Sequence, residues 1–122
     1  MIDLKVFIRA TIVGVVMELV LMTAVHFSTY VAHNDFLFGG MIITAVAGYL
    51  YGMDAAKGYF ASATGGAIVG VVAALVGVGI SVAAQDAPQR VIPFFTAICV
   101  FTGAIGGLFG QMSANIRRMG RR

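Results

Sequence analysis

Residues 60–84, FASATGGAIVGVVAALVGVGISVAA, contain no charged side chain. A helix rises about 1.5 Å per residue, so this stretch is long enough to cross the ~30 Å hydrocarbon core of a bilayer. The rest of the chain has the same character, since 60% of its 122 residues are hydrophobic and only 11% are charged. A soluble domain of that composition would be covered in apolar surface. The sequence therefore predicts an integral membrane protein.

Three further apolar stretches surround this one, at about residues 6–31, 36–53 and 91–112. Each is near the roughly 20 residues needed to span a bilayer. Lipid cannot satisfy unpaired backbone groups, and barrel strands would alternate in polarity, so helices are expected. The predicted fold class is an all-α membrane protein, a four-transmembrane-helix bundle that forms one domain over residues 1–122. Residues 113–122 are predicted to be a basic cytoplasmic tail.

Positive charges are divided unevenly between the two sides of the predicted bundle. Loops rich in Lys and Arg resist translocation and stay in the cytoplasm. One side holds Arg90 alone, and the other holds Lys5, Arg9, Lys57, Arg117, Arg118, Arg121 and Arg122. Both termini are therefore predicted to be cytoplasmic, in a multi-pass protein of the cell (inner) membrane. The four C-terminal arginines are expected to bind lipid headgroups.

Two segments echo two others at a nearly constant spacing. Residues 12–20, IVGVVMELV, match residues 68–76, IVGVVAALV, at seven of nine positions. Residues 48–52, GYLYG, echo residues 106–110, GGLFG. These matches favour a duplicated helical hairpin with two parallel halves. Chance similarity is the alternative, because the chain is rich in Val, Gly and Ala.

Small residues recur at every fourth position in three of the four stretches. Such stripes let helix backbones approach closely, and close approach is what holds helices together in lipid. The stripes predict helix packing within one chain or at an oligomer interface, through Gly48, Gly52, Gly66, Gly70, Gly103 and Gly107.

Glu18 lies near the middle of the first stretch. An ionised carboxylate at the centre of a bilayer costs at least ~2.5–3.5 kcal/mol on insertion scales, so Glu18 should face protein or water. Burial favours the neutral carboxyl, which can then trade its proton for a cation. The structural alternative is a neutral carboxyl hydrogen-bonded to a threonine or a carbonyl where two helices pair.

Other polar residues are expected around this carboxyl. Counting depth from the ends of each stretch places Thr44 and Thr102 near the level of Glu18. His26 lies about 12 Å further along the first helix, so it can relay protons to Glu18 only through water. We therefore predict a transport or proton site composed of Glu18, Thr44, Thr102 and His26.

Several other kinds of site are not expected. Cys99 is the only cysteine, which rules out an intrachain disulfide or a cysteine metal cluster. No third ligand is spaced to join the histidines at a metal, and no paired carboxylates or Ser–His–Asp set indicates an enzyme. The basic flanks fit headgroups and need no nucleic acid. We expect no catalytic residue, no metal and no cofactor.

Part of the first stretch resembles a known family. Glu18, Thr23, His26, Phe27 and Ser28 loosely resemble the first-helix pattern of Glu, Thr, Lys and Ser in the small multidrug resistance exporters. Those are also four-helix chains, and the resemblance implies exchange of protons for cationic drugs at the glutamate. It covers residues 18–28 only, and the chain lacks the Trp that the family uses in its binding pocket, so we do not place the chain in that family.

Two functions follow from where Glu18 points. If it faces a water-accessible cavity, the chain is a small transporter or channel for protons or small cations, most simply a homo-oligomer. If it faces a dry interface, the chain is an accessory subunit that docks on other membrane proteins through its glycine-rich helix faces. The expected partners are the lipid bilayer and either copies of the chain or other subunits.

Overall fold

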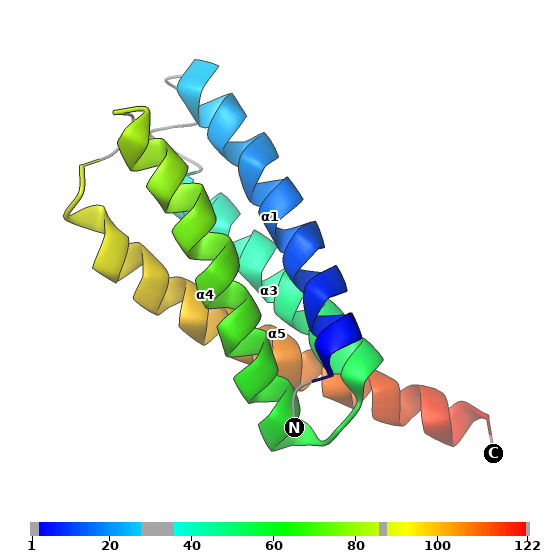
Figure 1. The fold of residues 1–122 in the computed structure, drawn as a ribbon. Coiled ribbons are helices and arrows are strands. Elements are labelled where there is room, and N and C mark those ends of the chain that lie inside the picture. The colour runs from blue at the N-terminus through cyan, green and yellow to red at the C-terminus, as the bar shows by residue number, and fades with distance from the viewer. Residues whose placement is uncertain (1–2, 28–35, 86–87, 122) are drawn as a thin grey trace.

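The computed structural model describes residues 3–27, 36–85 and 88–121 of the chain. Its elements are four α-helices, α1 (Leu4–Phe27), α3 (Phe36–Ala55), α4 (Tyr59–Ala83) and α5 (Val91–Gly120), as Figure 1 shows. The predicted all-α, four-helix bundle is confirmed. Residues 28–31, which the sequence assigned to the first helix, lie outside the described part of the chain.

Three of these helices, α1, α4 and α5, are long and apolar enough to cross a membrane. Large apolar side chains are exposed on their outward faces, among them Ile12 and Val20 of α1 and Phe94 and Phe101 of α5. Such surfaces are stable when lipid is the surrounding solvent. The chain is therefore a multi-pass membrane protein.

Local signals explain where the helices begin and end. Asp3 Oδ1 accepts a hydrogen bond from the Val6 N–H at 3.3 Å and so satisfies one free donor at the start of α1. After α3, Ala56 has a φ of 48° and Gly58 a φ of 106°, so the chain turns sharply into α4. Helix α5 runs on to Gly120, so most of the predicted tail is helical, and Arg122 lies outside the described residues.

The helices do not all meet. Helix α5 packs against α3 and α4, crossing them obliquely in Figure 1, and α1 packs against the same two helices. Within the described residues α1 and α5 make no contact. A two-fold axis relating two equal hairpins would pair α1 with α5 as it pairs α4 with α3. The packing therefore departs from the symmetry that a duplicated hairpin favours.

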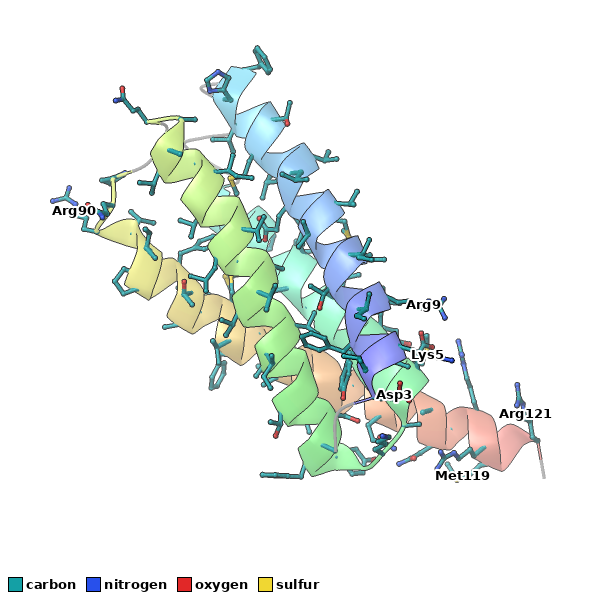
Figure 2. The ribbon with its side chains drawn as sticks, viewed as in Figure 1. Asp3, Lys5, Arg9, Arg90, Met119 and Arg121 are labelled. Atoms are coloured by element: carbon teal, nitrogen blue, oxygen red, sulfur yellow. The ribbon has the colours of Figure 1, made fainter. Side chains whose placement is uncertain are left out.

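Both ends of the chain lie at the same end of the bundle. The Phe7 ring contacts the Tyr51 ring edge-on, with centroids 6.4 Å apart, which places the start of α1 beside the end of α3. Arg118 Nη2 donates to the Ala56 carbonyl oxygen at 3.3 Å, which brings the end of α5 to the same connection. Figure 2 shows Lys5, Arg9 and Arg121 at this end and Arg90 at the other.

Candidate functional site

Glu18 lies on the face of α1 that packs against the rest of the bundle, and its side chain is 0% exposed. Neither carboxyl oxygen has a hydrogen-bond partner among the described residues. Buried polar groups are ordinarily hydrogen-bonded, because an unpaired one loses its interaction with water without compensation. An orphaned carboxyl in a membrane bundle is therefore an exception that calls for a functional explanation.

Helix α4 makes room for this carboxyl with a glycine. A Cβ added at Gly77 would come within 2.5 Å of Glu18 Oε2, so the carboxyl lies directly against the α4 backbone. One turn away, Gly14 brings α1 close to both neighbours, and a Cβ there would lie 3.1 Å from the Ala47 Cβ and 3.3 Å from the Ala73 Cβ. Small residues thus bring α1 close to α3 and α4 in this region, and no described residue donates to the Glu18 carboxyl.

The two threonines predicted for the site bond to each other instead. Thr44 Oγ1 lies 2.7 Å from Thr102 Oγ1, which joins α3 to α5. Thr44 also lies 3.0 Å from the Gly40 carbonyl oxygen, and Thr102 lies 3.1 Å from that of Ile98. One hydroxyl can donate to the other while the second donates to its own helix carbonyl. The pair is therefore satisfied without the Glu18 carboxyl.

Cys99 of α5 lies near both Thr44 and the Glu18 carboxyl. Its side chain is fully buried, lies beside Thr44 and is within electrostatic range of Glu18. The structure therefore places Glu18, Cys99 and Thr44 in one buried region with the half-buried Thr102 at its edge, and we call these four residues the midplane cluster. Among the described residues, no group of three His, Cys, Asp or Glu side chains is placed to hold a metal ion.

A cavity of about 250 Å³ lies between the last turns of α1 and α4, at the end of the bundle opposite the chain termini. Its polar lining consists of Thr23, His26 and Ser81, and the remainder is apolar. His26 is exposed there and packs edge-on against the Phe27 ring, with centroids 5.2 Å apart. The histidine of the predicted site thus lines this cavity, which we call the α1–α4 cavity, rather than joining the midplane cluster.

Between the midplane cluster and the end of the bundle that holds the termini, α3, α4 and α5 pack against one another through glycine. A Cβ at Gly48 would overlap the Gly103 carbonyl oxygen, and a Cβ at Gly52 would overlap that of Gly107. Contacts of this kind allow backbones to touch over several turns. The other two packing glycines, on α4, also lie against the α5 backbone: Gly66 and Gly70. All six glycines are used within one chain.

A polar network at the end that holds the termini was not predicted. Gln111 of α5 is buried, and its Oε1 accepts hydrogen bonds from the Gly58 N–H and the Ser62 hydroxyl, both at 2.9 Å. Its Nε2 donates to Asn115 Oδ1 at 2.9 Å, and Asn115 Nδ2 donates to the Tyr59 hydroxyl at 3.2 Å. Gln111 thus supplies the first turn of α4 with an acceptor that its own sequence lacks.

The C-terminal arginines extend from the last turns of α5. Arg117, Arg118 and Arg121 are exposed, and their neighbours Ile116 and Met119 are exposed as well. A helix end with basic and apolar side chains side by side suits a headgroup layer. Binding of lipid headgroups by these arginines stays a prediction.

Comparison of the chain with protein-family models, with curated proteins and with solved structures finds no match. The function must therefore be argued from the site itself. What the geometry provides is a buried carboxyl that no described residue binds, and a cavity between α1 and α4 that ends within one turn of it.

Proposed function

We propose that the chain is a small transporter or channel for protons or small cations, in which Glu18 takes up and releases the transported charge. The observation that carries the proposal is the Glu18 carboxyl, which is fully buried and lacks a hydrogen-bond partner among the described residues. An unpaired carboxyl in a membrane interior marks an ion or proton pathway more often than a structural contact. The proposed role involves no catalytic residue and no cofactor.

The role of an accessory subunit has less support. A carboxyl that only pairs helices would be expected to donate to a threonine or a carbonyl, yet Thr44 and Thr102 bond to each other instead. Docking through the glycine faces would need those faces to be free, and Gly48 and Gly103 are pressed together within one chain. A partner would have to use the large apolar side chains that otherwise face lipid.

The proposal includes a membrane arrangement. Helix α3 has 20 residues and lies among helices that are long enough to span, so we propose that it spans as well, with a rise of about 30 Å. We place both termini in the cytoplasm, because the end that carries Lys5, Arg9 and Arg121 is the more basic one. We also propose a homo-oligomer, since glycine contacts fill the cytoplasmic half of one bundle and leave no open path through it.

The experiment is a flux assay on proteoliposomes that contain only this protein. Proton and monovalent-cation movement is compared between the wild type and Glu18→Gln, which keeps the shape of the side chain but cannot titrate. The matched control is Asp54→Asn, which removes an exposed carboxylate from the end of α3. We expect flux in the wild type and the control and none in Glu18→Gln.

The opposite result is equally informative. If the purified wild type moves no ions, while Glu18→Gln weakens its co-purification with another membrane protein, the transport proposal fails. The accessory-subunit function would then replace it.

A further inference from the structure

The α1–α4 cavity ends within one helical turn of Glu18, since its lining begins at Leu19 on α1 and at Ile80 and Ser81 on α4. Met22, which lines the cavity, lies four residues after Glu18 on α1, and Ser81, which also lines it, lies four residues after Gly77 on α4. Residues four apart lie on the same face of a helix and about 6 Å apart along its axis. Since Glu18 rests against Gly77, the cavity floor and the carboxyl follow one another along a single α1–α4 seam.

Ser81 is the polar group at this floor. Its side chain is 1% exposed, and its hydroxyl has no hydrogen-bond partner among the described residues. Hydroxyls in helices commonly donate to the carbonyl four residues earlier, as Thr23 does to Leu19 at 2.8 Å and Thr64 does to Phe60 at 2.8 Å. Ser81 makes no such bond to Gly77, so its buried hydroxyl is an unpaired polar group at the cavity floor.

The cavity has the size and lining to hold water. At about 250 Å³ it has room for roughly eight molecules of ~30 Å³ each. Thr23, His26 and Ser81 supply polar partners along its length, which a buried water needs. On the other side of the midplane cluster, α3, α4 and α5 are held in backbone contact at their glycines.

We propose that the α1–α4 cavity is a water-filled entry that brings protons to Glu18 from the side of the membrane opposite the termini, with Ser81 as the positioning residue between them. Water at the cavity floor supplies the hydrogen-bond partner that the Ser81 hydroxyl lacks, and Ser81 holds that water on the α1–α4 seam that leads to Glu18. No covalent bond is made, and the proton that enters is the one that Glu18 binds. This inference rests on the proposed function and adds the side of access and the residue that lines it.

The test measures access to Ser81 directly. Ser81→Cys is made in a Cys99→Ala background, which removes the only native cysteine, and proteoliposomes of one orientation are treated from each side with the impermeant cationic reagent MTSET. The matched control is Val78→Cys, which lies on the same helix, is 0% exposed and is absent from the cavity lining. When MTSET is added on the side of the membrane opposite the termini, we expect Ser81→Cys to react at least about tenfold faster than Val78→Cys. A thiol sealed between helices reacts only when the helices separate locally.

A second measurement connects the entry to the carboxyl. The water-soluble carbodiimide EDC, added from the same side, should modify Glu18, and prior reaction of Ser81→Cys with MTSET should slow this modification. Mass spectrometry of the peptide that contains Glu18 gives the extent of reaction.

The outcomes separate this inference from the proposed function. If Ser81→Cys reacts no faster than Val78→Cys, or equally from both sides, the proposal of a water-filled entry is wrong, even if ion flux depends on Glu18. If Ser81→Cys reacts from one side and shields Glu18 while the wild type moves no ions, the entry stands and the transport function falls.

Discussion

Thr44 and Glu18 are both fully buried, yet the Thr44 hydroxyl has hydrogen-bond partners and the Glu18 carboxyl has none among the described residues. The Thr44 and Thr102 hydroxyl oxygens lie 2.7 Å apart, and their hydrogen bond joins α3 to α5. The carboxyl lies against Gly77 of α4 and has no hydrogen-bond partner among the described residues. At the scale of single residues, the midplane cluster thus combines a structural hydrogen bond with a carboxyl that no described residue binds.

The threonine pair is expected to behave as one stabilising unit. Thr44→Val and Thr102→Val should each reduce stability by about 0.6 kcal/mol, the average for hydrogen bonds between membrane helices. The double variant should lose little more than either single one, because both remove the same bond. Unfolding by denaturing detergent, followed by circular dichroism, measures the three values. Strictly additive losses would show that the hydroxyls act separately.

At the scale of helices, the positions of glycine determine which helix backbones approach most closely. The closest approaches join α3 to α5 and α4 to α5, where carbonyl oxygens occupy the space of missing side chains. Gly79, by contrast, has no heavy atom within 4 Å of an added Cβ. The chain therefore contains both packed and open helical glycines, which can be compared directly.

Gly48→Ala should destabilise the bundle and Gly79→Ala should not. The new methyl at Gly48 collides with the Gly103 carbonyl, a backbone atom that can move only if α3 and α5 separate, so we expect a loss of about 1–3 kcal/mol. In Gly79→Ala the helix gains intrinsic stability of about 0.5–1 kcal/mol without a clash. The same detergent unfolding assay measures both. Equal effects at the two positions would contradict the assigned packing.

The Gln111 network is expected to hold the turn between α3 and α4. Gln111→Leu keeps the volume but leaves the Gly58 N–H and the Ser62 hydroxyl without their acceptor. Opening of the first turn of α4 should become easier, and amide exchange over residues 56–62 should accelerate roughly tenfold, as the loss of about 1–3 kcal/mol implies. Hydrogen–deuterium exchange with mass spectrometry measures this. Gln89→Leu, at an exposed position near the other end of the bundle, is the control and should leave amide exchange over residues 56–62 unchanged.

The sequence predicted the four helices because hydrophobic length dominates in a membrane, and it singled out Glu18 because a charge in such a stretch is conspicuous. It missed Gly77 and Ser81, since one glycine and one serine carry little signal in a chain with 16 glycines. The glycine stripes indicated close contacts but could not say which helices would share them. The buried role of Gln111 was not predicted, because it depends on a turn distant in sequence.

At the scale of the whole molecule, charge and packing divide the bundle into two unlike ends. One end carries the termini, the polar network of Gln111 and most of the cationic side chains, and the other carries Arg90 and the α1–α4 cavity. The packing is asymmetric as well, since α1 touches α3 and α4 but not α5 within the described residues.

The proposed orientation predicts labelling from opposite sides. In a Cys99→Ala background, Gln89→Cys should react with MTSET in intact cells, because it lies beside Arg90 at the end that we place outside. Lys57→Cys should react only after the membrane is permeabilised. Both positions are exposed, so access to solvent is not limiting in either case. Labelling of Lys57→Cys in intact cells would reverse the orientation and, with it, the side from which the cavity is entered.

The position of Gly77 also has a consequence for how the protein is made. During synthesis, α1 emerges from the ribosome before α4, so Glu18 enters the bilayer well before the backbone that covers it exists. Until then the newly inserted helix carries an uncovered carboxyl in lipid, which favours its retention at the insertion machinery. Release should therefore coincide with the arrival of α4, and assembly of this small protein should be completed only after its third helix has been threaded into the membrane.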